Sequence, residues 1–487
     1  MKMYTKIFKS EGFEIKTNLC FILLSLLTTF LTFFIVYNAN WLFGDDLIFL
    51  RTTAIGKLLP LSEGINMSGR FFPLGHYDFN ILLLPGLKSA TAHYVFSAIS
   101  FIVFVTCISF FYSQLIYKIS KDRRYTSWLV MFCVIFLMAR FYPMFFYVIF
   151  PERLVIVLLS VFIILCFRFN ETDHWKYGIP ALFLAACLVY CKEPVSVALL
   201  VFSGTILIIN NKGLTKYKRI FYSLLVVNSI LFLFLYNYFV IIHSEILYTG
   251  GNRPMSVIEL LIKVFRDNKV LIPAFGLAFI RLFLIFYKKE KKYLIYDGFL
   301  FSGIAYTFAV LMLKLNFSYY YFPAVVLCFP ALVFWSVHYL NVKRVALILF
   351  VFALFSSVKL ADYIKTNQAE RISTYPKIVR LAELSKEGYQ IIWYQPKLSS
   401  SDLFNIQLRD YKKESLEGYL NYVFNDASCF KMNIMTDIKT EKLRMIVLYP
   451  EENIANVREN LEFKKSIEQN NGHQLTDIKG IQVYQLN

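Results

Sequence analysis

Residues 38–51 read Asn38-Ala39-Asn40-Trp41-Leu42-Phe43-Gly44-Asp45-Asp46-Leu47-Ile48-Phe49-Leu50-Arg51. This stretch directly follows the first long apolar run, Leu19 to Tyr37. Since about 20 apolar residues can cross a bilayer as a helix, the adjacent acids Asp45 and Asp46 are expected at the outer mouth of a membrane helix. Two carboxylates this close repel, and such a pair usually serves a cation, a substrate proton or a metal ion. The alternative is a solvated loop in which the two acids only mark the membrane boundary.

The composition of the chain is that of a protein with many membrane helices. Of its 487 residues, 57% are hydrophobic and 17% are charged, whereas soluble domains are about 25% charged. The formal charge of +18 does not indicate nucleic-acid binding, because the excess lies in short loops before residue 362. Residues 362–487 carry 17 basic and 17 acidic side chains. The cysteines show no metal-type spacing to histidines.

Eleven apolar runs are predicted to cross the membrane, the first as an uncleaved helix. The fifth and sixth are short and meet at residues 192–194, so they are also compatible with one re-entrant unit. The runs lie near residues 18–37, 91–117, 125–141, 152–168, 178–192, 194–210, 219–242, 269–287, 293–313, 317–339 and 343–361.

The distribution of basic residues predicts the orientation of these runs. Lysines and arginines gather at the N-terminus and in every second loop, which is typical of cytoplasmic segments. The N-terminus is then cytoplasmic, and the loop with Asp45 and Asp46 is extracytoplasmic, as is the C-terminus. The predicted domains are a membrane domain over residues 1–361, with the acidic motif in its outer loop 38–90, and a soluble domain over 362–487.

The soluble domain is predicted to be a small α/β domain. Residues 390–395, 444–449 and 481–486 read as strands, and residues 369–386 and 451–461 as helices. The expected fold class is therefore a mostly α polytopic membrane bundle, of about 11 transmembrane helices, with a small extracytoplasmic α/β domain at its C-terminal end.

The candidate site residues all lie at the predicted outer ends of helices. Charges at membrane depth are costly and usually face a cavity or a partner, so arginines and lysines here suit an anionic substrate and a carboxylate suits a base. Asp45 and Asp46 are the catalytic candidates. The candidates for substrate or phosphate binding are Arg70, Arg140, Glu152, Arg153, Lys192, Glu193 and His243.

Structural roles remain open for several of these residues. Arg140 is also compatible with a packing or topology role, and His243 with a structural one. Glu152 and Arg153 are compatible with a structural pairing to Lys192 and Glu193. No cofactor is required by the pattern, although a divalent metal ion is compatible with the acidic pair.

The whole architecture resembles the GT-C superfamily of membrane glycosyltransferases. The similarity lies in the acidic pair after helix one, the long first outer loop, the cationic outer loops and the outer C-terminal domain. Its motifs are Gly44-Asp45-Asp46 and Gly69-Arg70-Phe71, and the group it is most similar to is the serotype-converting O-antigen glucosyltransferases. The resemblance implies a polyprenyl-phosphate sugar donor and an acidic residue of loop one as the base.

The expected protein is thus a glycosyltransferase of the bacterial inner membrane. It would move a sugar, with glucose as the first candidate, from undecaprenyl phosphate to a lipopolysaccharide O-antigen or a similar glycan, with inversion. One alternative is an O-antigen polymerase, which would more naturally carry a large central outer loop. The other is a polysaccharide or lipid transporter, which is expected to carry charges near the bilayer midplane and paired broken helices.

Overall fold

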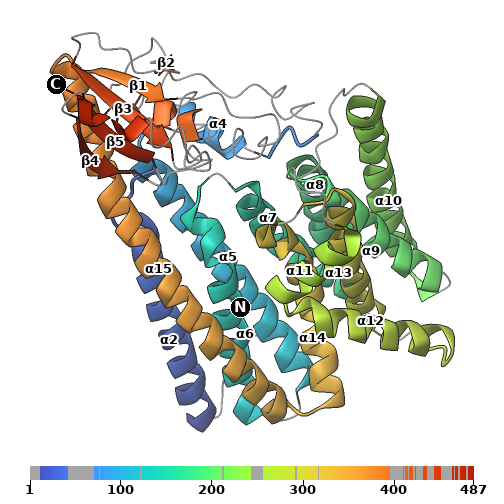
Figure 1. Cartoon of the computed structure of the whole chain (residues 1–487). Coiled ribbons are helices and arrows are strands. Elements are labelled where there is room, and N and C mark those ends of the chain that lie inside the picture. The colour runs from blue at the N-terminus through green and yellow to red at the C-terminus, as the bar shows by residue number, and fades with distance from the viewer. Residues whose placement is uncertain are drawn as a thin grey trace. The chain divides into compact units, whose positions relative to one another are not determined.

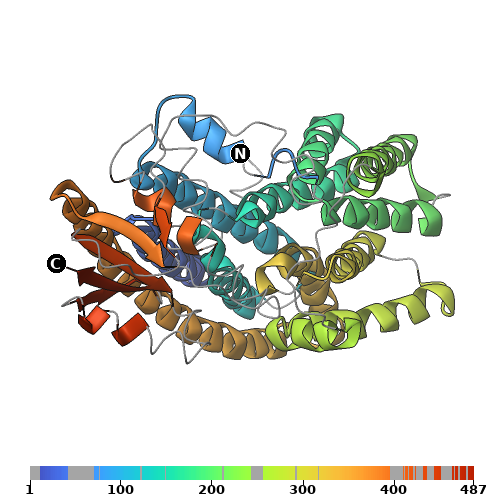
Figure 2. The same cartoon turned by 45° about the horizontal axis from the view of Figure 1, so that its top comes forward.

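The structure is a computed structural model, shown in Figures 1 and 2. The candidate residues Asp45, Asp46, Arg70 and His243 lie outside the described residues. The structure describes residues 11–41, 71–75, 77–120, 123–148, 150–210, 213–242, 256–290, 293–315, 317–394, 410, 412–414, 416–420, 423, 432–435, 444–450, 463–465, 467–469, 472–478 and 481–486.

The chain divides into two compact units. Unit 1 holds most of the apolar helices, with described residues 11–35, 71–75, 77–78 and residues between 95 and 363. Unit 2 combines residues 36–41 and 79–94 with the described residues from 364 onward. Two short pieces of the outer loop therefore belong to the same unit as the C-terminal sheet.

The predicted apolar runs all fall on helices. Eight helices of the described chain are long and apolar enough to cross a membrane, or nine if one bent pair is a single span. This confirms a mostly α, polytopic membrane-helix fold. The helices are α2 (Glu11–Val36), α4 (Tyr77–Leu83), α5 (Ala90–Ile119), α6 (Arg123–Phe146), α7 (Pro151–Thr172), α8 (Trp175–Cys191), α9 (Pro194–Asn210), α10 (Lys216–Tyr236), η3 (Asn237–Ile242), α11 (Val257–Asp267), α12 (Leu271–Phe286), α13 (Leu294–Met312), η4 (Ser318–Tyr321), α14 (Phe322–Tyr339) and α15 (Val342–Lys386).

Helix α13 lies at the centre of unit 1 and packs against α9 and α14. A Cβ added at Gly303 would lie 2.3 Å from Cys328 Sγ and 2.8 Å from the Ala324 carbonyl oxygen. Only glycine fits there, because the α13 and α14 backbones approach this closely. Small residues at helix contacts are how apolar helices associate without a hydrophobic driving force.

The predicted spans at 219–242 and 269–287 leave residues 243–268 as a loop between them, and the structure differs from this expectation. Residues 257–267 form α11, which meets α12 at a bend of 109°. Ser256 caps α11 in a capping box. Its hydroxyl accepts a hydrogen bond from the Glu259 backbone N–H, and the Glu259 carboxylate accepts one from the Ser256 backbone N–H. The box and the buried Leu260 and Val264 four residues apart are a helix signature that the loop prediction overlooked.

The last apolar run and the first helix of the tail are one element. Helix α15 runs 45 residues, from Val342 to Lys386, and passes through Pro376. Sequence reasoning separated a span at 343–361 from a helix at 369–386. No glycine or proline stands between residues 361 and 375 to interrupt the helix.

Unit 2 contains a five-stranded sheet in the order β2-β1-β3-β5-β4. Strands β1 (Gln390–Tyr394), β3 (Met445–Pro450) and β5 (Ile481–Leu486) confirm the three predicted strands, while β2 (Asn433–Met435) and β4 (His473–Asp477) were not predicted. β1 is parallel to β2 and β3, and β5 is antiparallel to β3 and β4. Every residue of the central strand β3 is buried, whereas the edge strand β4 is short and polar, which hid it from a search for apolar runs. The predicted helix at 451–461 lies outside the described residues.

Candidate functional site: a buried charge cluster in the membrane-helix unit

The first turn of α7 carries two of the predicted site residues. Pro151 occupies the first turn, where its missing N–H costs no hydrogen bond. Glu152 follows it, and a carboxylate is favoured at this positive end of the helix dipole. The side chains of Glu152 and Arg153 are both buried. The start of α7 therefore places two opposite charges inside the packed helices.

Two further predicted site residues, Lys192 and Glu193, lie where α8 ends and α9 begins. Lys192 has φ −158° and ψ 119°, an extended conformation that ends α8, and Pro194 starts α9. Lys192 and Glu193 therefore stand in a two-residue break between helices, and both are buried. The Ser196 hydroxyl donates to the Glu193 carbonyl at 2.7 Å, which satisfies one backbone group exposed by the break.

Ion pairs connect the first turn of α7 with the break between α8 and α9. Lys192 Nζ lies 2.5 Å from Glu152 Oε1, with both side chains at most 2% exposed. Arg153 Nη2 pairs with Asp78 Oδ2 of helix α4. Glu193 Oε1 accepts a hydrogen bond from the Phe71 backbone N–H at 3.3 Å. We name these five residues, Asp78, Glu152, Arg153, Lys192 and Glu193, the buried charge cluster.

Four of the predicted site residues are thus brought together, with one partner that sequence reasoning missed. Asp78 lies in the predicted outer loop as the acidic residue in the first turn of α4. A single acid in a predicted loop of mixed apolar and polar residues carries no distinctive signal, so its pairing with Arg153, 75 residues later, could only come from the fold. The predicted structural pairing is seen for Glu152 with Lys192, whereas Arg153 pairs with Asp78.

Three polar atoms on the first turn of α7 are buried and have no hydrogen-bond partner within the described residues, namely Arg153 Nη1 and both carboxylate oxygens of Glu152. Glu152 Oε1 still has the ion pair with Lys192, which leaves Arg153 Nη1 as a donor and Glu152 Oε2 as an acceptor. An unpaired buried polar group costs about 1–3 kcal/mol, and more if it is charged. A donor and an acceptor kept in this state on neighbouring residues indicate capacity to bind a polar ligand.

Arg140 has different partners from the buried charge cluster. Its guanidinium donates to the Asp267 carbonyl at 2.8 Å and to Asn268 Oδ1, both at the end of α11, and lies 5.0 Å from the centre of the Phe322 ring. Lys192 Nζ lies 4.5 Å from the Tyr320 ring, two residues before Phe322. One aromatic segment therefore contacts both cations. A phosphate-binding role for Arg140 stays a prediction.

A second buried charge pair was missed entirely. Arg281 of α12 bonds both oxygens of Asp297 of α13, at 2.8 and 3.0 Å, and its guanidinium lies 3.7 Å above the Trp335 ring. The Trp335 indole N–H also donates to Asp297, at 3.2 Å. Every charge in this group has partners, so it ties α12, α13 and α14 together.

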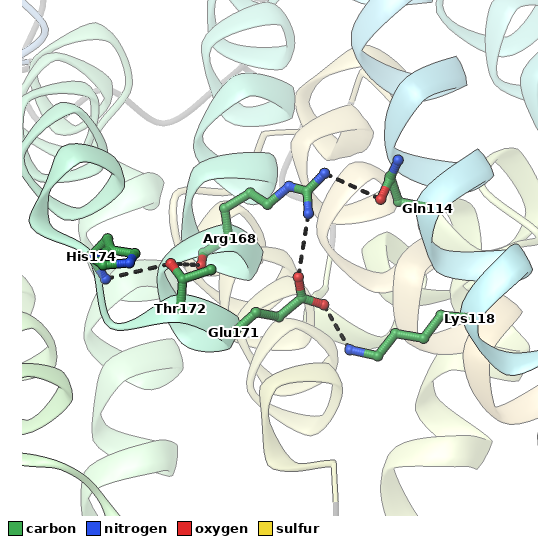
Figure 3. A network of polar contacts seen from close by, with 6 residues as sticks. All are labelled: Gln114, Lys118, Arg168, Glu171, Thr172 and His174. Carbon is green, nitrogen blue, oxygen red and sulfur yellow. Dashed lines mark hydrogen bonds and ion pairs between the residues drawn. The ribbon is translucent and has the colours of Figure 1, made fainter. Parts of the chain in front are cut away.

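Figure 3 shows a contrasting polar network between α5 and α7. Glu171 pairs with Lys118 at 2.7 Å and with Arg168 at 3.6 Å, and Arg168 also donates to Gln114 at 3.2 Å. These side chains are about a third exposed or more. Exposed ion pairs contribute only about 0–1 kcal/mol, so this network is a natural control for the buried one.

No group of three or more histidines, cysteines or acids that could hold a metal ion occurs within the described ranges. Asp45 and Asp46 are not among those residues, so the predicted compatibility of the acidic pair with a divalent ion stays a prediction.

The fold and the site together define a polytopic α-helical membrane protein with charges buried among its helix ends and a small five-stranded sheet near its C-terminus. No family model matches the chain, and no curated protein matches it. Among solved structures it is similar to ArnT from Cupriavidus metallidurans in the apo state, with 10% identity, a TM-score of 0.49, and coverage of 95% of this chain and 97% of that one. A similarity at this level carries no argument about function.

Proposed function

We propose that the protein is a GT-C-type glycosyltransferase that moves a sugar from a polyprenyl phosphate to a glycan acceptor at the extracytoplasmic face of the bacterial inner membrane. The observation that carries the proposal is the buried charge cluster, which unites four residues proposed for substrate binding. Buried charges among membrane helices are expensive, and they usually mark a pathway or a site. The sequence resemblance around Asp45 and Asp46 supplies the class of reaction.

The proposed reaction is a single displacement. A carboxylate of Asp45 or Asp46 takes the proton of the acceptor hydroxyl, and the hydroxyl oxygen attacks the anomeric carbon of the donor sugar. The bond from that carbon to the phosphate oxygen breaks, and polyprenyl phosphate leaves with the electron pair. Attack from the face opposite the phosphate inverts the anomeric centre.

Arg153 is the described residue best suited to the donor phosphate. Its Nη1 is a buried donor without a partner in the described chain, and a guanidinium matches phosphate geometry. The buried charge cluster has two cations and three carboxylates, a formal charge of −1 if all are ionised. A phosphate therefore needs a further cation, and we assign this role to Arg70, which would hold the phosphate together with Arg153 and Lys192. Glu152 Oε2 would accept from a sugar hydroxyl, and we propose Glu193, Arg140 and His243 as outer contacts.

Sugar transfer by the purified protein tests this proposal. The full chain in nanodiscs is given a polyprenyl phosphosugar and a lipid-linked oligosaccharide, and mass spectrometry follows both. Addition of one sugar residue, glucose first among the sugars tried, supports the proposal. Joining of whole repeat units identifies a polymerase instead, and movement of the lipid across the bilayer without a new bond identifies a transporter. Mass analysis of O-antigen from cells with and without the gene then identifies the natural acceptor and any change of serotype.

The first prediction concerns orientation. Because the basic loops are proposed to be cytoplasmic, a cysteine placed after Asn487 should react with a membrane-impermeant maleimide in intact spheroplasts. A cysteine at Lys289 should react only after the membrane is opened, when both cysteines are tested in a variant whose native Cys429 is replaced by serine. The reverse pattern would put the acidic pair in the cytoplasm and remove the need for a lipid-linked donor.

The second prediction concerns Arg153. Arg153→Ala should raise the KM for the donor with little change in kcat, because a charge-assisted contact worth about 1.5–3 kcal/mol is lost, which is about tenfold to a hundredfold. Asp78→Asn, which frees the same guanidinium from its partner, should lower or preserve that KM. Arg380→Ala on α15 is the matched control, since Arg380 is exposed and pairs only with Glu383 and Glu387 among the described residues.

A purely structural role of the Arg153–Asp78 pair predicts a different result from a role in donor binding. If Arg153 only stabilises helix packing against Asp78, both substitutions lower the thermal stability by similar amounts. The KM for the donor, measured on the folded fraction, then stays at the value of the unmodified protein in both variants.

A further inference from the structure

The chain leaves helix α2 through a segment that unit 2 holds at several points. Helix α2 ends at Val36, and Asn38 takes a left-handed conformation with φ 51°, which asparagine tolerates better than most residues. Trp41 is 1% exposed, and its ring packs 5.0 Å from that of His93. We name residues 36–41 the exit segment. It is fixed in place within unit 2, and Asp45 follows it after three residues.

Helix α15 presents a buried polar row within the same unit. Its members are Asn367, Gln368, Glu370, Arg371 and Thr374, each at most 9% exposed. Such a row is unusual on a helix that begins as an apolar span, because burying polar groups is unfavourable unless they are hydrogen-bonded. The row therefore has partners that matter to the fold or to function.

Two members of this row hold the exit segment directly. Arg371 Nη1 donates to the Tyr37 carbonyl oxygen at 3.2 Å, and Gln368 Nε2 donates to the same oxygen at 3.4 Å. This carbonyl lies at the C-terminal end of α2, where the helix dipole is negative and a cation is favoured. The contact bridges 334 residues of sequence.

The guanidinium is itself fixed on a second side. Arg371 is 1% exposed, and its central carbon lies 4.0 Å from the centre of the Tyr94 ring. Stacking on an aromatic ring and a hydrogen bond to a carbonyl leave a planar guanidinium little freedom. A lysine reaches the same carbonyl with one ammonium group but does not stack in this way.

We propose that Arg371 is a positioning residue for the acidic pair: by holding the Tyr37 carbonyl, it sets where the chain that carries Asp45 and Asp46 leaves α2. The inference rests on the proposed function, since it assigns Arg371 to the base of that reaction. It also explains why residues 36–41 and the described residues after 364 belong to one compact unit. The C-terminal part of the chain thereby takes part in catalysis without touching the substrate.

The experiment measures kcat and donor KM for Arg371→Ala, Arg371→Lys and Gln368→Leu in the full-length protein. A misplacement of about 1 Å at a reacting group can cost about 10²-fold. Arg371→Ala should therefore lower kcat by about that factor per folded molecule while the donor KM changes little. Arg371→Lys should recover part of the loss, and Gln368→Leu, which leaves one of the two donors, should show a smaller loss. Arg380→Ala, an exposed arginine on the same helix, should match the unmodified protein.

A double-mutant cycle separates positioning from mere stability. If Arg371 acts through the base, Arg371→Ala should have almost no further effect on kcat when the catalytic acid is already an asparagine. Additive losses, or an unchanged kcat with only a lower unfolding temperature, would overturn the inference. If Arg371→Ala does not fold, Arg371→Lys and Gln368→Leu carry the same comparison. Full activity of both acid-to-amide variants would instead contradict the proposed base, so the two failures are distinguishable.

Discussion

Asp45→Asn or Asp46→Asn is expected to lower sugar transfer by about 10²–10⁴-fold, which is the usual contribution of a general base. Asparagine has nearly the shape of aspartate but cannot accept the proton of the acceptor hydroxyl. Repulsion between adjacent carboxylates should also separate the two pKa values and leave one acid more basic. We therefore expect the two variants to differ, with the larger loss at the residue that serves as base.

The measurement is transfer from a polyprenyl phosphosugar by purified protein, with yield and unfolding temperature as controls. Both variants should insert and fold normally, because neither substitution changes the volume of the side chain much. Asp362→Asn in α15 is a matched control, an aspartate-to-asparagine change outside the predicted site. Should both single variants retain full activity, the base lies elsewhere, and Glu152 and Glu193 become the next candidates.

The second large effect is expected at the Glu152–Lys192 pair. Lys192→Met or Glu152→Gln alone should lower the free energy of unfolding by about 3–5 kcal/mol. Each substitution removes one charge of the pair and leaves the charge of the other residue buried without its partner. The double variant Glu152→Gln/Lys192→Met should recover most of that loss, since it removes both charges together. The quantity to measure is the denaturant dependence of unfolding in mixed micelles.

Glu171→Gln is the matched control for this prediction. Glu171 lies on the same helix, α7, and pairs with Lys118, but its side chain is 33% exposed. We expect a loss below about 1 kcal/mol. The activity of the double variant then tells a structural pair from a substrate site: a stable and active double variant would contradict a role in donor binding, and a stable but inactive one would support it.

The membrane helices were predictable because their signal is local. About 20 apolar residues in a row suffice to predict a span, and the three strands of the sheet that were predicted are apolar runs in their own right. Features with weak local signals were missed. Strand β4 is polar, α11 is short, and the continuity of α15 depends on a stretch whose composition changes from apolar to polar without a break.

The site was predictable in its residue types but not in its pairings. Charges next to apolar runs pointed to Glu152, Arg153, Lys192 and Glu193, because membrane burial makes such residues conspicuous. The partners Asp78 and Tyr37 could not be predicted in this way. Asp78 lies in a predicted loop rather than beside a predicted span, and Tyr37 contributes a backbone carbonyl, a group that every residue carries.

The shortness of α8 and α9 has a consequence for the lipid around them. Each has 17 residues, so as a span it measures about 25 Å at 1.5 Å per residue, whereas the hydrocarbon core is about 30 Å thick. If both helices cross the bilayer, such hydrophobic mismatch would draw the leaflets together beside them. The thinned bilayer would bring lipid headgroups down toward the junction at Lys192 and Glu193, so a lipid-borne phosphate could reach that depth without leaving its leaflet.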